Sequence, residues 1–211
     1  MSFRDQAVIP RAQSVRYQRW VMVRGVLLAL PAALLLWGLI FWLVPPLPDL
    51  TEPADRIPFA WRCCCVVVLL CFLPAIESVA HKRFGSPEID IVGQRPRQRS
   101  DVRFLQHSIE QLLLFIPGLL GLATYCRDGG EMRAVLAATA VWVVSRGMFR
   151  LGDDTGARWR GAGLVGMVQS VAILMYVSAR FGFDLAGWFG AIVPLVLVFG
   201  LEGYIIMTRR D

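Results

Sequence analysis

GVLLALPAALLLWGLIFWLV, residues Gly25–Val44, contains no charged side chain. A block of about 20 apolar residues is long enough for a helix to cross a hydrocarbon layer about 30 Å thick. The basic segment before the block is long and no small-residue cleavage site follows it, so we expect a retained helix rather than a signal peptide. The block therefore predicts an integral membrane protein.

Further apolar blocks follow along the chain. Three of them carry at most one carboxylate each: Cys63–Ala80, Gly161–Ala179 and Leu185–Met207. Two more can span only if polar residues enter the membrane: Leu112–Cys126, extended back to Phe104, and Ala134–Ser145, continued towards Arg150. The pattern predicts an all-α integral membrane protein with about six transmembrane helices. The two polar extensions are where function is expected.

The composition supports this class and excludes others. Hydrophobic residues make up 56% of the 211 residues, against about 45–50% in soluble domains. The net charge of +6 does not indicate a nucleic-acid partner, because the basic residues flank apolar blocks and no nucleic-acid-binding motif accompanies them. Consecutive helical residues point about 100° apart, so Cys63, Cys64 and Cys65 cannot converge on a metal. We expect no metal site and cysteines that act as small hydrophobes.

The basic residues also predict the orientation of the chain. If the N-terminus is cytoplasmic and six spans alternate, 17 of the 22 Lys and Arg residues fall on the inner side. The outer side keeps Arg56, Arg62, Arg127, Arg133 and Arg180. Under the positive-inside rule this bias places both termini in the cytoplasm. The lipid bilayer is therefore the first expected partner.

Polar side chains gather at the cytoplasmic start of the third predicted helix: Arg103, Gln106, His107, Glu110 and Gln111. At 100° per residue, Arg103, His107 and Glu110 share one helix face, with Gln106 beside them. A carboxylate at membrane depth is costly unless it is paired, so this face must meet protein or water. The cluster suits a zwitterionic, carboxylated small molecule. Alternatively, Glu110 pairs with an arginine and only stabilises helix packing.

Arg146 lies on the fourth predicted helix, on the same side as Arg150. Residues four apart on a helix are neighbours, so both cations face one direction. We expect Arg146 to pair with Glu110 or Glu77 across helices, in a structural rather than a catalytic role.

Two motifs and a basic pair resemble those of the MAPEG family, the membrane-associated proteins of eicosanoid and glutathione metabolism. The run RFLQHSIEQ, Arg103–Gln111, is similar to the family's Arg, then Asn four residues later, then Glu three beyond. SRGMFRLGD, Ser145–Asp153, followed seven residues later by Arg160, is similar to a second family motif. The pair Lys82-Arg83 falls where members carry arginines. The resemblance covers roughly residues 60–182 and points to a divergent bacterial-type member.

The resemblance implies a four-helix unit, a homotrimer and glutathione bound near the cytoplasmic face as co-substrate. Arg160 would stabilise the glutathione thiolate, and Arg83 would assist with a lipophilic substrate. Glutathione would be held by Arg103, Gln106, His107, Glu110, Gln111 and Asp153. The implied activity is that of a glutathione-dependent transferase or peroxidase in a bacterial inner membrane. His107 stands where the family has Asn. Asp153 stands where the family has Tyr, and its carboxylate would pair with Arg150 or Arg160.

The resemblance divides the chain into three parts. Residues 1–58 form a basic cytoplasmic N-terminus, an extra transmembrane helix and an outer loop. Residues 59–182 form the four-helix MAPEG-like domain, and residues 183–211 form an extra transmembrane helix with a basic tail. The added helices leave a second function open. In that alternative, the chain is a non-catalytic interaction or assembly subunit that keeps the fold and has lost the glutathione site.

Overall fold

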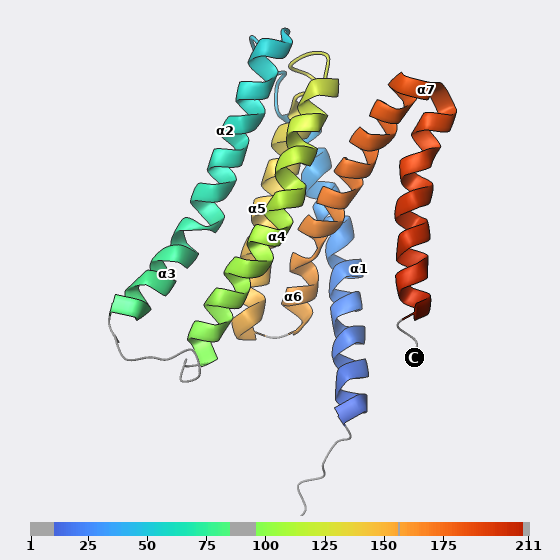
Figure 1. The fold of residues 1–211 in the computed structure, drawn as a ribbon. Helices are drawn as coiled ribbons and strands as arrows, with labels where there is room; N and C mark the ends of the chain where they lie inside the picture. Colours follow the sequence, from blue (N-terminus) through green and yellow to red (C-terminus); the bar gives the residue numbers. More distant parts are fainter. Residues whose placement is uncertain (1–10, 85–95, 156, 209–211) are drawn as a thin grey trace, which may run out of the picture.

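The computed structural model describes residues 11–84, 96–155 and 157–208, and these residues form helices and connecting turns without any strand. Figure 1 shows the helices as one elongated bundle. The helices are α1 (Arg11–Leu43), α2 (Pro53–Cys71), α3 (Leu73–Phe84), α4 (Pro96–Tyr125), α5 (Arg133–Thr155), α6 (Ala157–Gly163) and α7 (Val165–Thr208). The all-α prediction is confirmed for this part of the chain.

Five described helical stretches are long and apolar enough to cross a membrane. They are Trp20–Leu43, Pro53–Glu77, Phe104–Tyr125, Arg133–Gly152 and Trp159–Ile205. The polar extensions to Phe104 and past Arg146 are thus part of continuous helices. The stretches are compatible with a multi-pass membrane protein, as the apolar blocks predict.

The last stretch contains both of the last two predicted spans, because α6 and the two arms of α7 follow one another in it. It is 47 residues long, or about 70 Å at 1.5 Å per residue, more than twice the hydrocarbon thickness. The helix bends at Ala186 and Gly187, whose backbone angles are non-helical. Gly187 has φ +60, which glycine adopts without the steric cost that a Cβ would add. The two arms of α7 therefore run in opposite directions (Figure 1).

The first and the last described helix have their outer ends at the same end of the bundle. α1 begins and α7 ends at the lower end in Figure 1, where α3 ends, α4 begins and α5 meets α6. We call this the lower end and the opposite one the upper end. The charge bias predicts that the lower end faces the cytoplasm.

The main core lies between α2, α4 and α5. Phe115 of α4 stacks on Trp142 of α5 with ring centroids 5.1 Å apart, and neither side chain contacts solvent. Cys65 is exposed, and the other four cysteines are buried: Cys63, Cys64, Cys71 and Cys126. Burial raises the pKa of Cys126 to about 11, so this thiol stays protonated at neutral pH. The buried cysteines pack as the small hydrophobes that the sequence predicts.

Two arginines at the upper end bind carbonyl groups of the connections between helices, two of which directly follow a helix C-terminus. Arg56 donates to the carbonyl oxygen of Cys126 after α4. Arg133 donates to the carbonyl oxygens of Gly130 at 2.7 Å and Val44 at 3.0 Å. The last carbonyls of a helix have no partner within the helix, and they carry partial negative charge. These two cations of the predicted outer side therefore stabilise helix ends.

Replacing Arg133 by methionine is expected to lower the free energy of unfolding by about 1–3 kcal/mol, because two partly buried carbonyls lose their donor. Thermal unfolding of the purified protein measures the effect. Arg62→Met is the control, because Arg62 is an exposed arginine of the same end. An equal loss in both variants would show that the two hydrogen bonds contribute nothing specific.

Candidate functional site

The polar cluster lies on the lower part of α4. His107 Nδ1 and Glu110 Oε2 are 3.2 Å apart, and Gln106 Nε2 donates to Glu110 Oε1 at 3.3 Å. These contacts follow from helix geometry, because residues three and four apart are neighbours on the helix surface. The predicted shared face is confirmed for His107 and Glu110. Their side chains remain 47% and 57% exposed, so a ligand can reach both.

Gln111 lies on the inner side of the same helix. Its side chain is buried, and Oε1 has no hydrogen-bond partner among the described residues. A buried amide oxygen without a donor costs about 1–3 kcal/mol. A ligand N–H or O–H group would supply the missing donor.

The close approach of α5 and α6 positions Arg160. A Cβ on Gly152 would lie 2.4 Å from the backbone nitrogen of Arg160, so only glycine permits this approach of the two helices. Arg160 Nε donates to the Gly152 carbonyl oxygen at 3.3 Å. The guanidinium is thereby oriented by the backbone of α5, within the motif that resembles the family's second signature.

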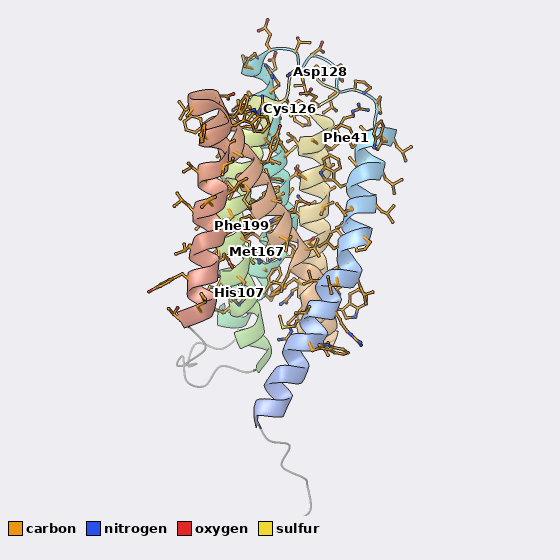
Figure 2. All side chains as sticks on the ribbon, turned by 90° about the vertical axis from the view of Figure 1, so that its right-hand side faces the viewer. Phe41, His107, Cys126, Asp128, Met167 and Phe199 are labelled. Atoms are coloured by element: carbon orange, nitrogen blue, oxygen red, sulfur yellow. The ribbon has the colours of Figure 1, made fainter. Side chains whose placement is uncertain are left out.

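A cavity of about 590 Å³ brings Arg160 together with His107, Glu110 and Gln111. We call it the α4–α6 cleft. Its remaining walls are apolar: Met22 of α1, Leu114, Phe149, Leu164 and Met167. Figure 2 shows His107 near the lower end and Met167 above it, towards the middle of the bundle. The cleft is therefore charged towards the lower end and apolar towards membrane depth, which suits an amphiphilic ligand.

Phe149 supports the charged part of the cleft. Its ring lies edge-on to His107 with centroids 6.2 Å apart and 6.1 Å from the ring of Phe104. These contacts restrict the His107 imidazole on the side facing α5.

The predicted pairing of Arg146 with Glu110 or Glu77 is wrong. Its side chain is 0% exposed, and it reaches no carboxylate among the described residues. Nη2 instead donates to the Gly163 carbonyl oxygen at 2.6 Å. The guanidinium carbon lies 5.0 Å from the Phe149 ring centroid and 5.5 Å from that of Trp142. Glu110 is instead in contact with Gln106 and His107 of its own helix.

The other predicted site residues divide into two groups. Gln106 is exposed, and it is connected to the cleft by its hydrogen bond to Glu110. The side chains of Arg83, Arg103 and Asp153 lie outside the described residues. Within the described part of the chain, no three His, Cys, Asp or Glu residues come together in a way that could hold a metal.

The sequence did not point to the apolar walls of the cleft. Met22 comes from the predicted extra helix, and Leu114, Leu164 and Met167 read as ordinary apolar positions. Only helical periodicity, which puts Leu114 near Glu110 and Gln111, could have indicated one of them.

No protein-family model, curated protein or solved structure matches the chain. The resemblance to the MAPEG family therefore stays a prediction from the quoted motifs.

Proposed function

We propose that this chain is a multi-pass membrane protein of the MAPEG type that binds glutathione in the α4–α6 cleft beside a lipophilic substrate. The observation that carries the proposal is the meeting of Arg160 with Glu110 and His107, about 50 residues away in sequence, in one cleft. A cation, a carboxylate and an amide acceptor match the thiolate, ammonium and amide N–H groups of such a tripeptide.

The proposed chemistry depends on Arg160. A thiol of pKa about 8.5 is mostly protonated at neutral pH, and a neighbouring guanidinium favours its anion. The thiol proton passes to water. The thiolate sulfur then forms a bond with an electrophilic carbon, and the displaced group leaves with the bonding electron pair. Leu114, Leu164 and Met167 would hold the lipophilic reactant beside the sulfur.

The proposed setting is a bacterial inner membrane with both termini in the cytoplasm, and the assembly is a homotrimer. The start of α1 and the end of α7 lie at the same end of the bundle, which supports an even number of crossings (Figure 1). The trimer rests on the family resemblance alone.

A non-catalytic interaction subunit is the second candidate. It is favoured by the terminal arm of α7, in which no described residue from Leu185 to Thr208 is buried. Large apolar side chains such as Trp188 and Phe189 are among the most exposed of the chain. This arm would then contact another membrane protein instead of lipid alone.

Glutathione titration of the detergent-solubilised protein tests the first proposal. Saturable binding is expected, and Glu110→Gln is expected to weaken it about 10- to 100-fold, as loss of a charged hydrogen bond does. Glu52→Gln is the control, because Glu52 is exposed and caps no helix through its side chain. Absence of saturable binding at millimolar glutathione, measured by calorimetry, would refute the proposal and favour the interaction subunit.

Ultraviolet absorbance of the bound thiolate tests the role of Arg160 separately. Arg160→Ala should abolish this absorbance while glutathione still binds, and the exposed-arginine control Arg62→Ala should keep it. Thiolate absorbance that persists in Arg160→Ala would assign the stabilising cation elsewhere.

A further inference from the structure

Arg146 is a buried cation whose hydrogen bonds are incomplete. One nitrogen, Nη2, binds the Gly163 carbonyl oxygen. Nε and Nη1 are buried and have no hydrogen-bond partner among the described residues. An arginine inside a membrane-spanning helix is costly unless its charge and its donors are satisfied. The rings of Trp142 and Phe149 lie against the guanidinium, and neither ring carries an acceptor oxygen.

Arg146 lines a cavity of about 290 Å³, which we call the Arg146 cavity. Phe104, one of its walls, packs on Phe149, which is a wall of the α4–α6 cleft. Arg150 also lines the Arg146 cavity, and none of the described residues that line it is acidic. Its other walls come from α2, the start of α3 and Phe104 of α4. Pro74 has no N–H to donate to Leu70, which accounts for the break between α2 and α3. Figure 1 shows α3 diverging from the other helices towards the lower end.

The walls of the Arg146 cavity change from cationic to apolar along the membrane normal. Arg150 and Arg146 lie two and six residues before Gly152, where the apolar stretch of α5 ends. At 1.5 Å per residue, this places them about 3 and 9 Å from that end. Leu70 and Val143 line the cavity further towards the middle of the bundle. Leu70 is 55% exposed, so the apolar wall continues onto the lipid-facing surface.

We propose that the Arg146 cavity binds an anionic phospholipid, with phosphate oxygens on the Arg146 guanidinium and an acyl chain along Leu70 and Val143. The phosphate supplies the acceptors that Nε and Nη1 lack, and Arg150 adds charge at headgroup depth. A free phosphate would meet the same cations but would leave the apolar wall without an occupant. The gradient from cation to apolar wall therefore favours the lipid.

Thermal unfolding of delipidated protein in detergent tests the site. Added phosphatidylglycerol should raise the melting temperature by about 5 °C or more at saturation. Phosphatidylcholine and glycerol phosphate at equal concentration should not. Arg146→Met should lose the response, and Arg62→Met should keep it, because it removes an exposed arginine at the other end.

A second variant keeps the test informative if Arg146→Met does not fold. Gly147 lines the Arg146 cavity, and a Cβ added there meets nothing within 4 Å. Gly147→Leu should therefore fold and obstruct the lipid. Gly38→Leu is the matched control, since a Cβ on Gly38 of α1 also meets open space. Native mass spectrometry should show retained phosphatidylglycerol in the wild type and the control only.

Three results would overturn the proposal. A wild-type response in Arg146→Met or Gly147→Leu would exclude the cavity as the site. An equal response to phosphatidylcholine would exclude recognition of the anion. A response to glycerol phosphate alone would assign the site to a soluble phosphate and not to a lipid.

Discussion

Gly163→Leu is expected to destabilise the bundle by about 3 kcal/mol or more and to abolish ligand binding. A Cβ on Gly163 would lie 2.4 Å from Cβ and 2.6 Å from Cα of Phe149. The clash involves the backbone of α5, which cannot move as a flexible side chain does, so the cost lies at the upper range of overpacking. The Gly163 carbonyl also accepts the hydrogen bond from Arg146. Displacing α6 therefore disturbs both the α4–α6 cleft and the Arg146 cavity.

The measurement is thermal unfolding together with glutathione titration. Gly38→Leu again serves as control, because it adds the same side chain to a helical glycine with open space. A Gly163→Leu protein that unfolds at the wild-type temperature would contradict the close approach of α5 and α6.

Trp142→Ala is expected to lower the free energy of unfolding by about 3 kcal/mol, the lower end of the range for a buried tryptophan. The side chain is 0% exposed and stacks on Phe115. Its indole nitrogen has no hydrogen-bond partner in the described structure, so the loss is one of packing. The lower end applies because a chain unfolded in lipid still surrounds the ring with apolar groups, leaving mainly lost dispersion and the cavity.

Unfolding by increasing denaturing detergent measures the effect. Trp42→Ala is the matched control, because Trp42 is 78% exposed on the surface of α1. Equal destabilisation by both substitutions would mean that the Phe115–Trp142 contact does not belong to the stable core.

The apolar blocks predicted the helices well, because hydrophobic length is a property of the chain itself. They did not predict the sharp bend at Ala186 and Gly187 that joins the last two predicted spans. That bend depends on the positive φ of Gly187 and on the approach of Gly182 and Gly190, where an added Cβ would lie about 2 Å from the other arm's carbonyl oxygen. Glycines in an apolar run do not reveal which of them makes a bend.

The candidate site was predictable in its local part only. The contacts among Gln106, His107 and Glu110 lie within one helix turn, so their spacing is sufficient to predict them. The pairing of Arg146 was predicted wrongly, because spacing does not say which face of α5 meets which neighbour. The close packing at Gly152 and Gly163 brings Arg160 to the cleft that Glu110 lines, while Arg146 binds the Gly163 carbonyl oxygen beside Phe149.

By itself, the sequence determined the all-α class, the apolar helices and the polar face of α4, because each depends on residues close together in the chain. The tertiary structure decided which cations share a cavity, since that depends on the contacts between helices. It joined Arg160 to Glu110 across α4 and α6, added Met22 from α1 to the same cleft, and left Arg146 buried with two nitrogens unsatisfied.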